Sequence, residues 1–250
     1  MRTVYMICNA HIDPVWQWEW EEGAAETLST FRVAADFCEE FDGFVFNHNE
    51  AMLCRWVEEY EPALFARIRR LVRAGRWHIM GGWYLQPDCN MPSGESFVRQ
   101  IESGLSYFQE KFGVRPTTAV SVDAFDHTRG LVQILKKTGF DSYLFCRPWA
   151  SFQDLPEGVF DWVGYDGSRV MAYRINDSYA SPLGKAAEKI ETAARRSNAP
   201  IEVCLWGVGD HGGGPSRQDL QAIVRLTERL RKEGLRLLHA TPEQYFAAEA

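Results

Sequence analysis

The sequence lacks several features that would assign a protein to a class at once. Its six cysteines form no C-x-x-C pair, which argues against a disulfide framework and against a cysteine-based zinc site. No apolar run is long enough to cross a bilayer, and strand-like sequence begins at residue 3 without a recognisable signal peptide. Scattered cysteines within apolar segments favour a reducing compartment. We therefore expect a cytoplasmic protein with no membrane partner.

Positive charge is also scarce. The formal net charge is −7, and no dense Lys/Arg run stands outside the helical patterns, so no nucleic-acid partner is expected. Hydrophobic residues make up 46% of the 250 residues and charged residues 24%, as in ordinary soluble proteins. No repeat, linker or low-complexity tract divides the chain, which predicts a single domain over residues 1–250.

Strand-like and helix-like segments alternate along the whole chain. Strands are expected at residues 3–10, 43–47, 76–81, 118–122, 142–146, 201–206 and 235–239, with a hairpin over 159–175. Helices are expected at residues 24–41, 50–74 with a break at Pro62, 93–111, 129–138, 183–197 and 216–233. The strands are apolar throughout, as in a parallel sheet covered on both faces. Such repeated units predict an α/β fold, either a barrel or a doubly wound sheet.

Polar residues follow six of these strands at their C-terminal ends, where parallel α/β folds build their active sites. The residues after successive strands are His11 and Asp13; His48; Trp83 and Asp88; Asp123 and His127; Arg147 and Trp149; and Asp210 and His211. Six loops that carry such side chains at one rim favour a functional site.

His11 and Asp13 form the first candidate pair. An imidazole and a carboxylate two residues apart at a strand end can converge on one cation, although an H-x-D pair is also common in ordinary loops. Asp123 follows another apolar strand and is expected at the same mouth, unless it only caps the following helix. Two carboxylates and one imidazole suit Zn²⁺ with one position left open for substrate.

Asp210 lies in a glycine-rich loop between a strand and a helix. Such loops often bind phosphate, but this one has neither the G-K-[ST] ending nor the G-x-G-x-x-G spacing. Facing Asp123 across the rim, Asp210 would complete a carboxylate pair suited to glycoside hydrolysis. Trp16, Trp83 and Trp149 are candidate sugar platforms, or alternatively core residues. His78 and His239, inside or ending strands, are expected to be structural.

Four segments together resemble the N-terminal catalytic domain of glycoside hydrolase family 38, the retaining α-mannosidases. His11-x-Asp13-Pro14-x-Trp16 resembles the first zinc motif of that family, and residues 82–100 resemble its longest signature. Residues 123–125 match the nucleophile segment, and residues 209–215 match the acid/base segment. The resemblance extends from Tyr5 to about Phe246, with the segments in the family's order.

The resemblance implies a fold, a cofactor and a set of roles. The fold would be a seven-stranded parallel (β/α)7 barrel, an incomplete TIM-like barrel of the glycoside hydrolase/deacetylase superfamily. His11, Asp13 and Asp123 would bind Zn²⁺; Asp123 would also be the nucleophile, and Asp210 the general acid and base. The substrate would be an α-mannoside oligosaccharide or glycan. Residues implied as substrate contacts, together with rim candidates from the sequence, are Trp16, Trp83, Asp88, His48 and His211.

The sequence also departs from the family pattern. Asp126 stands where family members usually have glycine, and full enzymes of the family continue into helical and β-sandwich domains. Their fourth zinc ligand is a histidine beyond the last residue of this chain, so either His211 replaces it or that ligand lies outside the chain. A metal-dependent carbohydrate deacetylase and a non-catalytic sugar-binding domain remain as alternative functions.

Overall fold

The computed structural model describes residues 1–196, 198–209 and 211–250, which form two compact units. Unit 1 comprises Met1–His48, Leu53–His78 and Ser178–Ala248. Unit 2 comprises Asn49–Met52, Ile79–Asp177 and the last two residues. Asp210, the predicted acid/base, lies outside the described residues.

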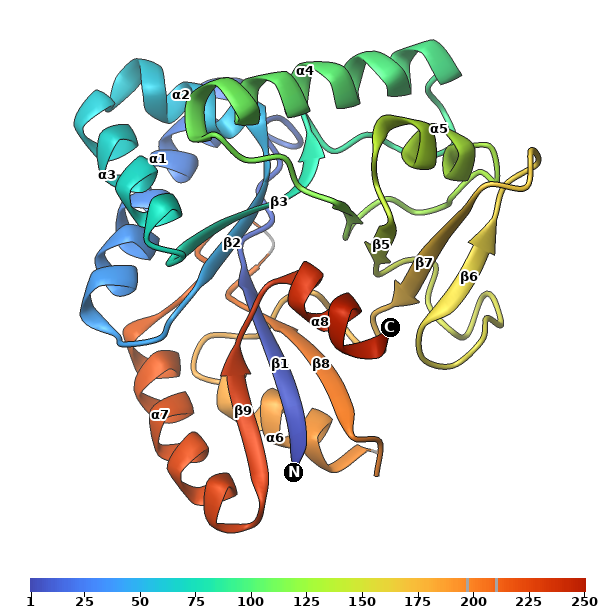
Figure 1. Ribbon diagram of the computed structural model, residues 1–250. Coiled ribbons are helices and arrows are strands. Elements are labelled where there is room, and N and C mark those ends of the chain that lie inside the picture. The colour runs from blue at the N-terminus through green and yellow to red at the C-terminus, as the bar shows by residue number, and fades with distance from the viewer. Residues whose placement is uncertain (197, 210) are drawn as a thin grey trace. The chain divides into compact units, whose positions relative to one another are not determined.

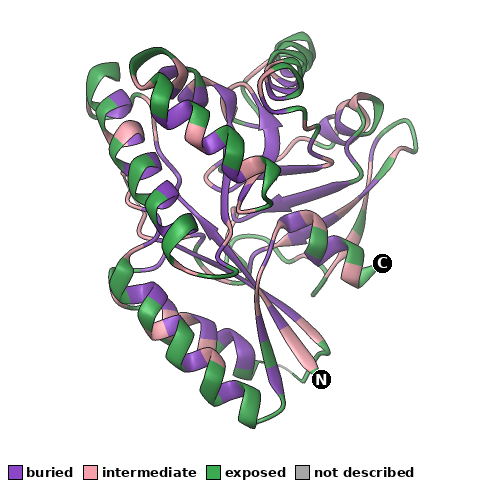
Figure 2. Ribbon diagram, turned by 60° about the vertical axis from the view of Figure 1, so that its left-hand side comes forward, coloured by how far each residue is buried: buried purple, intermediate pink, exposed green. Residues whose placement is uncertain are grey.

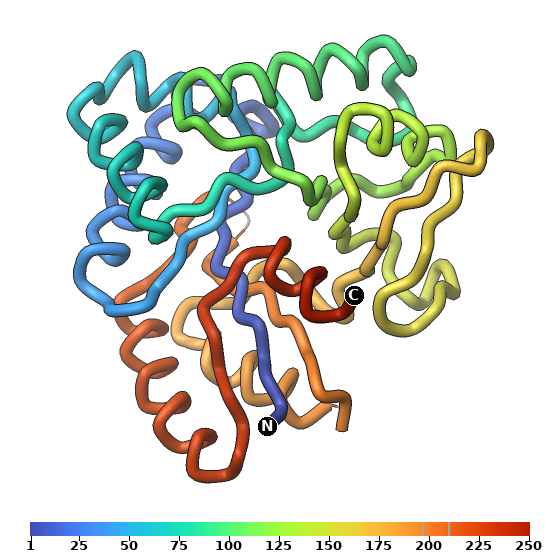
Figure 3. The backbone as a smooth tube through the Cα atoms, in the orientation of Figure 1, coloured from blue at the N-terminus to red at the C-terminus, as the bar shows by residue number. Residues whose placement is uncertain are grey.

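The sheet of unit 1 is built around its first strand. Strand β1 (Arg2–Asn9) pairs in parallel with β8 (Ile201–Trp206) along one edge. Its other edge is shared by β9 (Leu235–His239), which pairs with the first part of β1, and β2 (Phe46–Glu50), which pairs with its last two residues (Figures 1 and 3). Strand β3 (Trp77–Trp83) follows β2 in the sheet order, and both strands continue into unit 2.

Most helices of unit 1 bury one side and expose the other (Figure 2). In α7 (Arg217–Lys232), Leu220, Ile223, Leu226 and Leu230 recur at helical spacing and are all buried. Ser216 caps this helix, because its side chain accepts a hydrogen bond from the Asp219 amide. The other helices are α1 (Trp20–Glu40), α2 (Ala51–Tyr60), α3 (Pro62–Arg73), α6 (Ala186–Arg196) and α8 (Pro242–Glu249).

Unit 2 contains a second sheet in the order β4-β5-β7-β6. Strands β4 (Thr118–Ser121), β5 (Ser142–Phe145) and β7 (Arg169–Arg174) are parallel, and β6 (Phe160–Val163) pairs antiparallel with β7 as the predicted hairpin. This sheet carries the candidate residues that follow β4 and β5.

Two helices bury their apolar faces in the core of unit 2. Helix α4 (Gly94–Phe112) begins at the Ser93 cap and ends at Gly113, which adopts a left-handed conformation with φ of 73°. Its residues Phe97, Ile101 and Leu105 share one buried cluster with residues of α5 (Leu131–Thr138). Each fully buried side chain of this kind contributes about 1.5–3 kcal/mol relative to exposure.

The predicted mixed α/β fold with parallel strands is confirmed, but a seven-stranded barrel is not shown. The described strands form one five-stranded and one four-stranded sheet, and neither sheet closes on itself. The prediction of a single domain stays a prediction. None of the described helices combines the length and apolar character needed to span a bilayer.

Candidate active site

His11 and Asp13 meet just beyond the end of β1. Nε2 of His11 lies 3.3 Å from Oδ1 of Asp13, so the two side chains converge as their spacing predicts. The imidazole is 5% exposed and packs edge to face against the ring of Tyr179, whereas about a third of the Asp13 side chain is exposed. A buried imidazole beside a solvent-facing carboxylate is an arrangement that an incoming ion can reach.

The spacing of this pair fits two ligands of one zinc ion. Ligands about 2.1 Å from a tetrahedral ion lie about 3.4 Å from each other, close to the observed 3.3 Å between Nε2 of His11 and Oδ1 of Asp13. The same distance also permits a long hydrogen bond from an imidazole N–H to the carboxylate. In neither unit do the described residues bring together three His, Cys, Asp or Glu side chains around one point.

The loop after His11 is held by its own surroundings in unit 1. The indole Nε1 of Trp18 donates to the backbone oxygen of Asp13 at 3.1 Å. Helix α1 packs directly on the loop, because a Cβ at Gly23 would lie only 2.1 Å from the Pro14 oxygen. Trp16 remains 64% exposed and contacts the Trp18 ring edge to face, so one indole face is available to a ligand.

The glycine-rich loop after β8 lies against the same segment. The amide of Gly212 donates to the backbone oxygen of His11 at 3.3 Å. The ring of His211 packs against Trp18 at a tilt of 40° with 3.6 Å between centroids, and its Nε2 lies 3.4 Å from a carboxylate oxygen of Glu22. The role of His211 as a fourth zinc ligand stays a prediction.

Asp123 belongs to unit 2 and forms an ion pair with Arg147. Both Nε and Nη2 of Arg147 lie 2.8 Å from Oδ1 of Asp123. The guanidinium also sits over the rings of Phe125 and Trp149, at 4.8 Å and 5.1 Å from their centroids. An arginine fixed by two aromatic faces and a carboxylate has little rotational freedom, so it orients Asp123.

The backbone beside Asp123 is fixed separately by Gln86. Oε1 of Gln86 accepts from the Val122 amide at 3.0 Å and from Nδ2 of Asn49 at 3.4 Å. The backbone N–H of Gln86 in turn donates to the buried carboxylate of Glu50 at 2.9 Å. The ends of β2 and β4 are therefore joined through one side chain.

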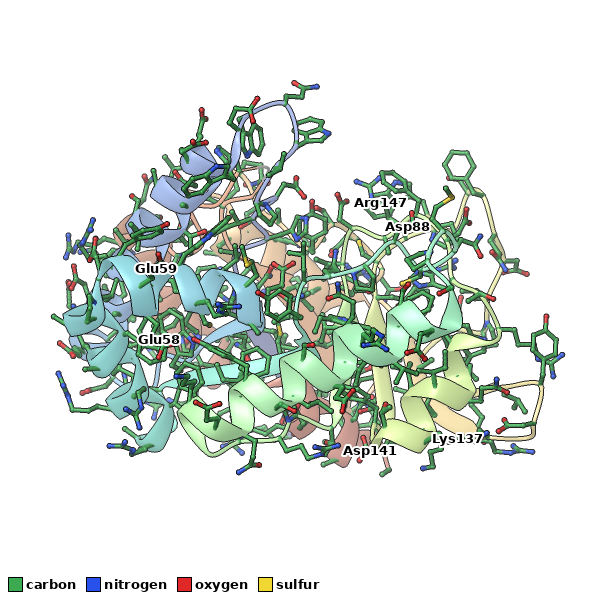
Figure 4. The ribbon with its side chains drawn as sticks, turned by 90° about the horizontal axis from the view of Figure 1, so that it is seen from above. Glu58, Glu59, Asp88, Lys137, Asp141 and Arg147 are labelled. Atoms are coloured by element: carbon green, nitrogen blue, oxygen red, sulfur yellow. The ribbon has the colours of Figure 1, made fainter. Side chains whose placement is uncertain are left out.

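The sequence interpretation did not assign roles to Arg147 and Gln86. A charged residue two positions after the buried strand β5 is the available signal for Arg147. For Gln86 the sequence holds no signal beyond its place in the motif at residues 82–100. Asp88 and Arg147 both lie on loops (Figure 4). Oδ1 of Asp88 accepts from the amides of Asn90 and Met91, so this carboxylate at least stabilises its own turn.

Two predicted substrate contacts, Trp83 and His48, lie in the interior. Trp83 is fully buried, and its Nε1 donates to the Val120 oxygen at 2.7 Å within the core of unit 2. His48 is 1% exposed and packs edge to face against Phe31 in unit 1. Both lie in strands that continue further than predicted, so their side chains face the core rather than a loop.

The comparisons with known proteins agree with the motifs. The sequence profile described as the glycosyl hydrolases family 38 N-terminal domain matches residues 1–249. The chain belongs to glycosyl hydrolase family 38. It is 30% identical to α-mannosidase G of Dictyostelium discoideum and 31% identical to human α-mannosidase 2C1, over 97% and 98% of its length. It spans only 22% and 24% of those two proteins.

Solved structures extend the likeness to the fold of this family 38 chain. An α-mannosidase from Enterococcus faecalis V583 superposes with a TM-score of 0.84 at 18% identity, covering 99% of this chain and 29% of that one. A putative polysaccharide deacetylase from Mycobacterium smegmatis superposes with a TM-score of 0.63 at 13% identity, covering 99% and 92%. At these identities the likeness concerns the fold alone.

Proposed function

We propose that this family 38 chain is the N-terminal catalytic domain of a zinc-dependent retaining α-mannosidase that acts on glycans. The observation that carries the proposal is the match of nearly the whole chain to curated proteins named α-mannosidase. Two contacts suit this reaction: His11 converges with Asp13, and Arg147 forms an ion pair with Asp123.

The proposed reaction has two steps on the mannose anomeric carbon. An oxygen of Asp123 attacks that carbon and forms an ester bond, while the bond to the leaving oxygen breaks and Asp210 supplies its proton. Water then attacks the same carbon, gives its proton to Asp210 and releases Asp123 as a carboxylate. Two displacements retain the configuration of the sugar.

Arg147 would serve both steps by holding Asp123 in one rotamer. Its two contacts and the rings of Phe125 and Trp149 fix the guanidinium before substrate arrives. A preorganised nucleophile avoids the cost of ordering the side chain during attack. The exposed indole of Trp16 would stack on the sugar beside the His11–Asp13 pair.

Zinc would be held by His11, Asp13 and Asp123, where it would bind and polarise sugar hydroxyls. The imidazole and carboxylate of the first pair are suitable donors at a suitable spacing. We also propose a cytoplasmic location, supported by six cysteines that are all buried and take no part in disulfides.

Hydrolysis of 4-nitrophenyl α-mannoside tests the proposal. The protein should release 4-nitrophenol in the presence of Zn²⁺. Asp123→Ala should abolish turnover while the folded fraction of the protein stays the same as in wild type. Equal turnover by Asp123→Ala and wild type would contradict the proposed role of Asp123. Release of acetate from an acetylated sugar would indicate a deacetylase, and binding of mannose without turnover would indicate a sugar-binding domain.

A further inference from the structure

In unit 2 a series of hydrogen bonds connects the backbone of Arg147 to His127 and Tyr143. Nε2 of His127 is 2.7 Å from the backbone oxygen of Arg147, and Nδ1 of His127 is 2.8 Å from the hydroxyl of Tyr143. A backbone carbonyl can only accept, so Nε2 carries the hydrogen. Burial lowers the pKa of His127, which favours the neutral ring. Nδ1 of the neutral ring therefore accepts from the Tyr143 hydroxyl, and the tautomer is fixed.

The series of hydrogen bonds continues from Tyr143 to the strand that precedes Asp123. Sγ of Cys89 lies 3.6 Å from the Tyr143 hydroxyl and 3.6 Å from the hydroxyl of Ser121, the last residue of β4. The Thr128 amide donates to the Cys89 oxygen at 3.3 Å, which brings the two segments together beside His127. Neither Cys89 nor His127 has a role in the proposed reaction itself.

The segment after Arg147 borders an open pocket, which Pro148 and His127 both line. The other lining residues come from the following loop and from β5 and β6: Phe145, Gln153, Leu155, Phe160 and Trp162. The hydrogen bonds of His127 link the Arg147 carbonyl to Tyr143 of β5, whereas Arg174 donates to the oxygen of the next residue, Pro148, at 3.4 Å.

We infer that His127 is a positioning residue that holds Arg147, through its backbone carbonyl, where the guanidinium orients Asp123. Tyr143 sets the tautomer that makes this possible, and Cys89 and Ser121 anchor Tyr143 to β4. The catalytic meaning of the inference rests on the proposed role of Asp123 as nucleophile. The alternative is a core histidine whose hydrogen bonds stabilise the fold without directing Arg147.

The Nε–H signal of Arg147 in ¹H–¹⁵N NMR spectra separates these two roles without any substrate. Its assignment comes from its loss in Arg147→Lys. His127→Phe keeps an aromatic ring but removes both hydrogen bonds, whereas Phe145→Leu changes a ring packed 4.8 Å from the imidazole and keeps both bonds. The signal should be sharp in wild type and Phe145→Leu and exchange-broadened or shifted in His127→Phe.

Tyr143→Phe provides a milder second variant that keeps the ring and removes only the hydroxyl. It should permit the other tautomer, visible in the ¹⁵N shifts of His127, and weaken the Arg147 signal. An unchanged Arg147 signal in both His127→Phe and Tyr143→Phe would overturn the inference. Equal loss in Phe145→Leu would overturn it too, because packing would then suffice as an explanation.

Turnover of 4-nitrophenyl α-mannoside gives the catalytic arm of the experiment. A displaced nucleophile should lower kcat of His127→Phe about 10- to 100-fold. Full kcat in His127→Phe beside an active wild type would overturn the positioning role. If the wild type itself is inactive, the proposed function fails, and the NMR comparison still decides whether His127 positions Arg147.

Discussion

Arg147 directs two nitrogen atoms, Nε and Nη2, at a single oxygen of Asp123, each at 2.8 Å. The pair joins the loop after β4 to the loop after β5, which are adjacent parallel strands. An ion pair in this place fixes a carboxylate at the strand ends of the sheet, where α/β enzymes place their reacting groups.

Arg147→Lys should reduce turnover while leaving the fold intact. A lysine ammonium cannot reproduce the planar two-nitrogen contact with Oδ1 or the stacking between Phe125 and Trp149. We expect kcat to fall about 10- to 100-fold, measured on 4-nitrophenyl α-mannoside. Arg129→Lys is the matched control, because Arg129 also lies over an aromatic ring in unit 2 but bonds to the Val163 oxygen. Equal losses in both variants would contradict a specific role for Arg147.

Trp83 and Trp16 should respond in opposite ways to substitution. Trp83→Phe removes the hydrogen bond to Val120 and part of a buried ring, so the free energy of unfolding should fall by about 1–3 kcal/mol. Trp16→Ala removes an exposed ring and should raise KM with little effect on stability. Urea denaturation and steady-state kinetics measure the two effects. A raised KM in Trp83→Phe at unchanged stability would restore Trp83 as a substrate contact.

His239 should make the protein less stable in mild acid. Burial lowers the pKa of its imidazole from 6.5 to about 4. Between these values the unfolded chain binds a proton that the folded chain does not, so the free energy of unfolding falls as pH falls. The loss from this group is at most about 3 kcal/mol near pH 4.

His239→Gln should therefore show a smaller fall in unfolding free energy between pH 6.5 and pH 4.5 than wild type, as measured by urea denaturation. Phe44→Leu is the control, because it trims the ring packed 5.3 Å from His239 and leaves the titrating group in place. The same pH dependence in wild type and His239→Gln would rule out this assignment.

Zinc should stabilise the protein through His11 and Asp13. A ligand that binds only the folded state adds about 2.7 kcal/mol at one hundred times its Kd, so added Zn²⁺ should raise Tm and a chelator should reverse the rise. His11→Gln and Asp13→Asn should abolish most of this shift. His78→Gln, which alters a histidine paired with Glu243 at 2.7 Å, should retain it. An identical zinc-induced shift in His11→Gln would exclude His11 as a ligand.

Local signals predicted much of the fold. Helix α4 begins after Ser93 and ends at Gly113, within a residue or two of the expected ends, because capping and left-handed glycine act over a single turn. Strand β2 begins and ends later than expected: Asn49 and Glu50, whose polarity is typical of a loop, are buried strand residues. The extra helix α8 has no clear apolar stripe in its sequence and was not predicted.

The candidate site was predictable in part, because some of its contacts join residues close together in the sequence. His11 and Asp13 are two residues apart, so their convergence depends on the local backbone just beyond β1. Arg147 lies 24 residues from Asp123, and no periodicity in the sequence connects them. The burial of Trp83 depended on the extension of β3 by a few residues, which is the least predictable property of a strand.

Covalent trapping tests the central claim most directly. A fluorinated mannosyl donor that reacts quickly with a nucleophile but leaves slowly should label the zinc-loaded protein, and mass spectrometry of its peptides should place the sugar on Asp123. Prior incubation with mannose should protect this residue. A label on another residue, or active hydrolysis with no label on Asp123, would contradict the account.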